Sequence, residues 1–173
     1  MRPEKEIDHI ERERIFAGPV EAICDPAMIA HCRDPYHDHP KGCPKWGSTK
    51  DGCPPHVRYF PQVYSPEVYI ATVKFNFADY LNLRRRKHPN WTERALRNLR
   101  HWQDHVRSEL RHFLFDYLSV HPEIDGEIVF NPEAMGVNLF ETCAQADIIL
   151  EKTPTYFVHK VVLIAKRLSE DHS

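Results

Sequence analysis

The sequence lacks several features that would assign a function directly. Its 173 residues contain no glycine-rich phosphate-binding loop, no Gly-x-Ser-x-Gly nucleophile motif and no His-Glu-x-x-His zinc motif. It also contains no internal repeat and no low-complexity tract. The sequence therefore shows none of the motifs of the P-loop NTPases, the α/β-hydrolases or the zinc metalloproteases.

An excess of charge of one sign and long apolar runs are also missing. The formal net charge is −2, so binding to nucleic acid would depend on a local concentration of positive charge. The longest apolar runs, such as VVLIA at 161–165, are far shorter than the roughly 20 residues of a membrane span. The first residues are charged and show no apolar signal region. We therefore expect a cytoplasmic protein without a membrane partner. In the reducing cytoplasm, cysteines more often bind metals or react than form disulfides.

Composition predicts one folded domain over residues 1–173, because 42% of the residues are hydrophobic and 28% are charged. Within it, residues 23–66 contain eight of the fourteen prolines, so neither a long helix nor a central strand is expected there. An irregular segment of this length is uncommon in a small domain unless a ligand organises it. We therefore predict a metal-binding segment at 23–66, followed by a body at 67–173.

The body alternates between strand and helix patterns. Strands are predicted at 67–75, 126–130 and 156–167, and short helices at 76–87 and 137–147. One long helix is predicted at 91–118, where apolar residues follow the spacing of one helical face and Asn90 and Glu93 form a capping box. The fold class is therefore α/β or α+β, with a small central sheet, one long helix and an attached loop rich in cysteine and proline.

Four of the five cysteines lie in the irregular segment: Cys24, Cys32, Cys43 and Cys53. Their separations of seven, ten and nine residues are too long for the Cys-x-x-Cys pairs of zinc fingers. Iron–sulfur proteins use more varied spacings, and ferredoxins have a ligand cysteine followed by proline. Cys43 and Cys53 each lie between a glycine and a proline, which would let backbone amides approach sulfur and would restrain the loop. This chemistry favours a bound metal or cluster over inert thiols.

Two stretches resemble a known family. CPKWGSTKDGCPP at 43–55 resembles the Cys-Pro-x-Tyr-Gly…Cys-Pro-Pro segment of an uncharacterised prokaryotic family of predicted metal-binding proteins. NPEAMGVNLFETCAQADIIL at 131–150 is similar to that family's Ser-Met-Glu-Ala-x-Gly-Ile-Asp-Val stretch, and VHKVVLIA at 158–165 is similar to its closing strand. The resemblance implies a metal or iron–sulfur centre at Cys43 and Cys53, with Cys32 as the upstream partner.

The sequence also departs from that family. It has no cysteine at 119–132, where the family has a second cysteine cluster, and it has Trp46 and Asn138 where the family has tyrosine and aspartate. The resemblance therefore implies a short or divergent member with one metal site at most, and it does not extend to a two-cluster electron relay.

The fourth ligand of the predicted centre is a choice between two arrangements. With Cys24 as a ligand the site is closed, which suits structure or electron transfer. Without it, one iron is open to substrate, to sulfide or to a histidine, and it can act as a Lewis acid. The histidines near enough in sequence are His31, His37, His39 and His56. The open arrangement is favoured, because Cys24 directly precedes Asp25-Pro26, an expected helix start, and has no flanking glycine or proline.

Positive charge is concentrated at 84–112, with nine lysines and arginines against three acidic residues. On the predicted long helix, one face opposite the apolar stripe carries Arg97, Arg100, Arg107 and Arg111. Such a face could bind the phosphates of an RNA, for example a tRNA, although an ordinary solvated helix face is the favoured interpretation. Glu133 and Glu141 are candidate acid or base groups, and Cys143 is expected to be a buried packing residue.

The predicted function is binding of an iron–sulfur cluster, of the four-iron type. It would serve redox, sulfur-transfer or desulfuration chemistry on an unidentified small molecule or RNA, with a protein redox partner. The alternative is a loop stabilised by zinc on a module that binds RNA or protein without catalysis. The sequence leaves open whether the protein is an enzyme.

Overall fold

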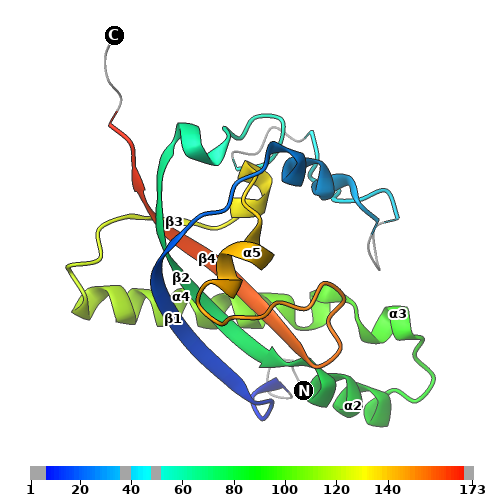
Figure 1. Cartoon of the computed structure of the whole chain (residues 1–173). Helices are drawn as coiled ribbons and strands as arrows, with labels where there is room; N and C mark the ends of the chain where they lie inside the picture. The colour runs from blue at the N-terminus through cyan, green and yellow to red at the C-terminus, as the bar shows by residue number, and fades with distance from the viewer. Residues whose placement is uncertain (1–6, 36–39, 48–51, 170–173) are drawn as a thin grey trace.

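An antiparallel sheet of four strands lies at the centre of the computed structural model, which describes residues 7–35, 40–47 and 52–169 (Figure 1). The strands are β1 (Arg12–Glu21), β2 (Tyr64–Asn76), β3 (Glu127–Val129) and β4 (Phe157–Arg167), in the order β1-β2-β4-β3. Every neighbouring pair is antiparallel. The fold is therefore α+β, the second of the two predicted classes.

The central pair, β2 and β4, is buried on both faces. Their register places Ile70 opposite Leu163, and alternate residues of β4 point to opposite faces. Val162 and Ile164 belong to one apolar cluster, whereas Val161 and Leu163 belong to the other. The apolar residues at successive positions of β4 thus reflect packing on both of its faces.

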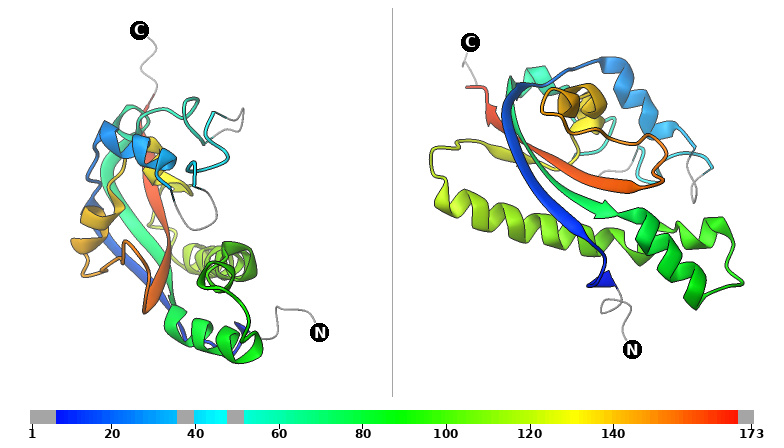
Figure 2. Two further views of the ribbon diagram at one scale, coloured as in Figure 1. Left: turned by 90° about the vertical axis from the view of Figure 1, so that its right-hand side faces the viewer. Right: turned by 60° about the horizontal axis from the view of Figure 1, so that its bottom comes forward.

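Helices cover the two faces unequally (Figure 2). One face carries α2 (Phe77–Lys87), α3 (Glu93–Leu96), the 3-10 helix η3 (Leu99–His101) and α4 (Gln103–Val120). The other face carries shorter elements, namely the 3-10 helices η1 (Pro26–Arg33), η2 (Phe60–Gln62) and η4 (Pro132–Met135), and α5 (Leu139–Ala144). Trp102, Val106 and Leu110 anchor α4 against the sheet, as their spacing predicts.

The prediction of one helix over 91–118 is wrong. Thr92, not Asn90, caps α3 by accepting the amide of Ala95, and the chain then breaks at Asn98. The side chain of Asn98 accepts the amide of Arg100 at 3.0 Å and starts η3, so α4 begins only at Gln103. Asparagine side chains compete with helical hydrogen bonds in this way. The apolar stripe crosses the break, which is why its spacing gave no sign of it.

Most other elements agree with the sequence. The strands predicted at 67–75, 126–130 and 156–167 are confirmed as β2, β3 and β4, and the helix at 76–87 as α2. The helix predicted at 137–147 is shortened to α5, which Asn138 caps. β1 was not predicted; it is an edge strand with many charged residues and a register shift between Ala17 and Val20. Of the described helices, none is long and apolar enough to cross a membrane.

The described parts of residues 23–66 consist mainly of short 3-10 helices and turns, and β2 begins at Tyr64, within this range. The start of this segment pairs with the loop before α5. An isolated bridge joins Cys24 to Val137, the amide of Asp25 donates to the Gly136 carbonyl at 2.8 Å, and the amide of Asn138 donates to Ile23 at 2.7 Å. The cysteine segment is thus fixed to the part of the chain that contains η4.

Candidate metal centre

Three of the predicted ligands, Cys32, Cys43 and Cys53, line one cavity of about 560 Å³. The cavity lies between the cysteine segment, the region around η3 and the start of α4, and η4. Leu99, Arg100, Gln103, Asp104 and Arg107 form the helical wall, and Asn131, Glu133 and Ala134 form the wall at η4. The fold therefore places the thiols beside cationic and acidic side chains from distant parts of the sequence.

A close backbone approach brings Cys43 to Cys32. The amide of Cys43 donates to the carbonyl of Cys32 at 2.7 Å. Gly42 makes this approach possible, because its φ is +83° and a Cβ there would lie 2.5 Å from the carbonyl carbon and oxygen of Arg33. Only glycine adopts this conformation readily and leaves this space.

Both Cys-Pro steps begin turns. The carbonyl of Cys43 accepts the amide of Trp46 at 3.1 Å, and the carbonyl of Cys53 accepts the amide of Val57 at 3.1 Å. The amide of Gly47 donates to the carbonyl of Pro54 at 3.0 Å and so joins the two turns. The loop is therefore held by backbone hydrogen bonds on both sides of residues 48–51, which are outside the described part.

Cys43 and Cys53 lie close enough to influence the Cys32 thiol. Burial raises the pKa of the Cys32 thiol, and the neighbouring Cys43, Glu133 and Cys53 raise it further. Metal ligation requires thiolates, so binding at Cys32 would have to displace a firmly held proton. However, no group of three or more His, Cys, Asp or Glu side chains is positioned to hold a metal ion among residues 7–35, 40–47 and 52–169. The thiols share a cavity wall without converging on one point.

Cys24 is not among the residues that line this cavity. Its thiol donates to the carbonyl of Ala22 at 3.5 Å, and burial together with Glu21 raises its pKa. Asp25 accepts the amide of Ala27 and caps η1, so the expected helix start after Cys24 is confirmed as a 3-10 helix. The structure thus brings together three of the four predicted cysteines and places Cys24 elsewhere.

The candidate histidines are not gathered at the thiols either. His31 and His56 are exposed, and His31 lies 2.5 Å from the Asp34 carboxylate. Neither is among the described residues that line the cavity. His37 and His39 lie outside the described residues.

The four arginines do not lie on one helix, as the prediction had them. The break at Asn98 leaves Arg97 at the end of α3, whereas the other three follow in η3 and α4. Arg97 donates to the Pro154 carbonyl at 2.8 Å and pairs with Glu93 at 3.4 Å. Arg100 and Arg107 instead line the cysteine cavity, and Arg111 lies over the ring of Phe130. Two of the four arginines therefore line the same cavity as the three cysteines.

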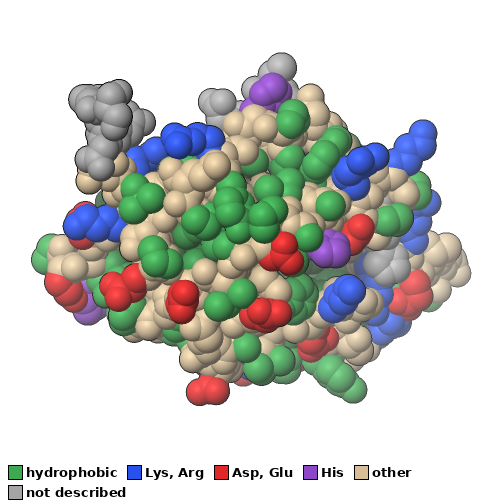
Figure 3. Space-filling view, turned by 45° about the horizontal axis from the view of Figure 1, so that its top comes forward, with side chains coloured by type: hydrophobic (Ala, Val, Ile, Leu, Met, Phe, Trp, Pro, Cys, Tyr) green, Lys and Arg blue, Asp and Glu red, His purple; other side chains and the backbone are tan. Residues whose placement is uncertain are grey.

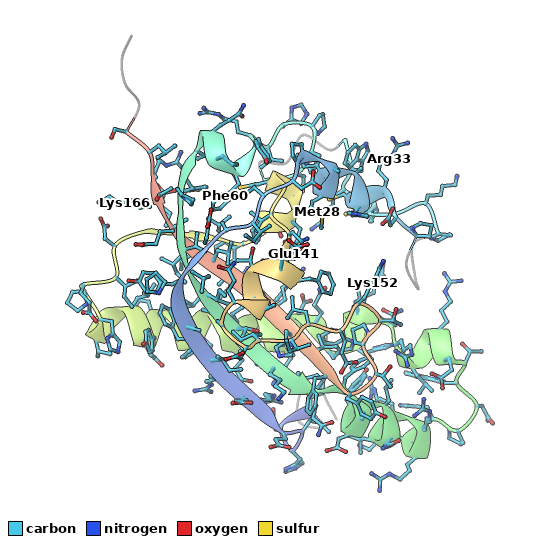
Figure 4. All side chains as sticks on the ribbon, in the orientation of Figure 1. Met28, Arg33, Phe60, Glu141, Lys152 and Lys166 are labelled. Atoms are coloured by element: carbon cyan, nitrogen blue, oxygen red, sulfur yellow. The ribbon has the colours of Figure 1, made fainter. Side chains whose placement is uncertain are left out.

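Of the two candidate acid or base groups, only Glu133 lines the cavity. Part of Glu133 is exposed to solvent, but burial of its carboxyl group by the surrounding protein raises its pKa. A hydrogen bond from its own backbone amide and the charge of Lys160 oppose this shift. Glu141 is an exposed residue in the first turn of α5 (Figure 4). Cys143 is fully buried, as predicted, and burial raises its pKa to about 12.

Sequence reasoning missed Gln103 and Asn131, which line the cavity, and Lys160, whose charge acts on Glu133. The one available signal was Lys160, a single cation within the apolar run FVHKVVLIA at 157–165. Gln103 and Asn131 carry no signal in the sequence, because their place in the cavity depends on the packing of α4 and η4.

Comparisons with protein-family models, with curated proteins and with solved structures found no match. The resemblance of residues 43–55 and 131–150 to a metal-binding family therefore remains a prediction. Those two stretches do meet in space, since Cys53 and Glu133 line the same cavity.

Proposed function

We propose that the protein binds an iron–sulfur cluster of the four-iron type through Cys32, Cys43 and Cys53. One iron would be open, and the centre would serve redox or sulfur-transfer chemistry on a bound substrate. The observation that carries this proposal is the single cavity that these three cysteines line, although they come from a segment with little regular structure. When bound, the cluster would supply either an electron or a Lewis-acidic iron.

The residues around the thiols fit such a group in kind. Thiolates are the soft ligands that iron–sulfur clusters and zinc select. Arg100 and Arg107 line the same cavity and would offset the negative charge of a thiolate-bound cluster. The ligands would still have to move together, since the described side chains do not converge.

The zinc-stabilised alternative has less support. A structural zinc ion is enclosed by four ligands, whereas the described cavity has three cysteines in its wall and a volume of about 560 Å³. The RNA-binding part of that alternative depended on one arginine face, which is divided between α4 and the region before it. The face of the molecule in Figure 3 carries acidic as well as basic side chains around an apolar centre, so it is not uniformly basic either.

The test is anaerobic reconstitution with iron and sulfide, followed by a count of both per chain and by visible and electron paramagnetic resonance spectra. The wild type and Cys24→Ser should bind the cluster, and Cys43→Ser should lose it. Cys143→Ser is the matched control, because this thiol is buried in the apolar cluster around α5. A colourless protein that holds one tightly bound zinc after anaerobic purification would contradict the proposal. Loss of the cluster in Cys24→Ser would contradict its open form.

A further inference from the structure

A second cavity, of about 200 Å³, adjoins the cysteine cavity. Its wall consists of Lys45, Arg107, Leu110, Arg111, Phe130, Asn131, Lys160 and Val162. Four of these residues are cations, and no Asp or Glu is among those that the structure describes in this wall. Lys45, Arg107 and Asn131 also line the cysteine cavity, so the two spaces share a wall.

The second cavity exists because β3 is short. β3 pairs with Ala165, Ile164 and Leu163 of β4, and the chain then turns away at Phe130. From 157 to 162, β4 pairs with β2 on one side, and the described residues include no strand on the other side. Lys160 therefore lies beside the uncovered part of the β4 edge, with α4 packed over the same face of the sheet.

Among the described residues, the positive charges of this cavity have few acidic partners. Burial lowers the pKa of Lys160, Arg107 lowers it further, and Glu133 opposes this effect from the cysteine cavity. Arg107 has an ion pair with Asp104 at 3.4 Å, but the Asp104 side chain is 89% exposed, so that pair is weak. Lys160 and Arg107 are half-buried, whereas Lys45 and Arg111 are exposed. Like charges that share one concave wall repel one another, and a bound anion would relieve this repulsion.

We propose that this second cavity is an anion subsite, which binds the phosphate group of a small-molecule substrate whose remainder extends toward Cys32, Cys43 and Cys53. Arginine and lysine together suit phosphate, because the guanidinium group donates paired hydrogen bonds and the ammonium group adds a compact charge. Arg111 lies over the ring of Phe130, 5.7 Å from its centroid, a contact that favours one placement of its guanidinium group. The part of this inference that concerns chemistry at the thiols rests on the proposed function, whereas the binding of the anion does not.

A small phosphorylated molecule fits this cavity better than RNA. The space is concave and of the size of one charged group, whereas RNA binding without base readout uses an extended basic groove with aromatic stacking platforms. Arg97, which would extend a basic track along the helices, instead contacts Pro154 and Glu93. Binding of RNA is therefore an outcome that the experiment must distinguish.

The test is a titration of the metal-free protein with inorganic phosphate at low chloride, monitored by calorimetry and by phosphorus NMR. The wild type should bind phosphate in the millimolar range, and Lys160→Met and Arg111→Gln should each weaken binding about tenfold. Lys166→Gln is the matched control, because it removes one positive charge from the same strand. The Lys166 side chain forms an ion pair with Asp125. In Figure 4, Lys166 lies on the opposite side of the molecule from Arg33, which follows Cys32.

Three results would overturn the inference. They are the absence of phosphate binding in the wild type, equal binding by the wild type and both cavity variants, and tighter binding of a single-stranded RNA that small phosphorylated compounds fail to displace. If Lys160→Met does not fold, as judged by circular dichroism, Arg111→Gln alone decides. Cys32→Ser distinguishes the two proposals, since it should lose the cluster and keep phosphate binding. Cluster binding without phosphate binding would overturn only the anion subsite.

Discussion

The sheet and the cysteine segment are stabilised by different interactions. In the sheet, β2 and β4 pair over their length, and Val68, Ile70 and Leu163 have no exposed surface. In the cysteine segment, η1 has no buried residue, and the described loop is held by individual backbone hydrogen bonds. Apolar burial accounts for the stability of the sheet, whereas the described part of the segment before Phe60 contributes no buried hydrophobic residue to the core. A ligand would therefore affect the order of the segment far more than that of the sheet.

Truncation of the core should have the largest effect on stability. Leu163→Ala removes a side chain that is fully buried in the cluster on the α5 face, and it should lower the free energy of unfolding by about 2–5 kcal/mol. Urea denaturation monitored by circular dichroism measures this change. Leu168→Ala is the control, because Leu168 is 44% exposed and should change stability by less than about 1 kcal/mol. Equal effects of the two substitutions would contradict the statement that apolar burial accounts for the stability of the sheet.

A substitution in the cysteine segment should disturb the site more than the fold. Gly42→Ala places a Cβ 2.5 Å from the carbonyl of Arg33 and should break the hydrogen bond between Cys43 and Cys32. We expect faster hydrogen exchange at the Cys43 amide and loss of cluster reconstitution. The urea midpoint should change by less than for Leu163→Ala, because η1 contributes no buried residue to the core.

Gly47→Ala is the matched control for this experiment. Gly47 also has a positive φ, of +72°, but a Cβ there would meet nothing within 4 Å. Both substitutions carry the backbone strain of a left-handed conformation, and only Gly42→Ala adds the clash. Equal hydrogen exchange and equal reconstitution in the two variants would show that the close approach at Arg33 does not organise the segment.

The same contrast explains what could be predicted from sequence. β2 and β4 were predictable because branched and aromatic residues dominate them, and burial of such residues is a local signal. β1 was missed because RERIFAGPVE is charged and contains Gly18-Pro19, features that only an edge strand tolerates. The break at Asn98 was missed because apolar spacing continues through it.

The candidate site likewise has features that the sequence predicts and features that only tertiary packing determines. The cysteines were recognisable by residue type and by their glycine and proline neighbours. Their sharing of a cavity with Arg100, Arg107 and Glu133 depends on tertiary packing of α4 and η4, on which local sequence has no bearing. Lys160 belongs to the anion subsite only because β3 ends before reaching it.

The smallest expected effect concerns the pH dependence of the sheet. Burial lowers the pKa of His159, and Lys74 lowers it further, while Glu151 and Glu13 oppose the shift. The unfolded chain therefore takes up a proton near the ordinary pKa of 6.5, before the folded protein does. Stability should be at its full value above this pH and should decrease as the pH falls toward the lower pKa of the folded state.

His159→Gln removes the titrating group, so the difference in unfolding free energy between wild type and variant should depend on pH only below about 6.5. Urea denaturation at intervals from neutral to mildly acidic pH measures this difference, with His56→Gln as the exposed control. Because His159 lies on β4, its titration acts through the sheet and should leave hydrogen exchange at Cys43 unchanged. A pH-dependent change at Cys43 that His159→Gln abolishes would show that the sheet and the cysteine segment are coupled.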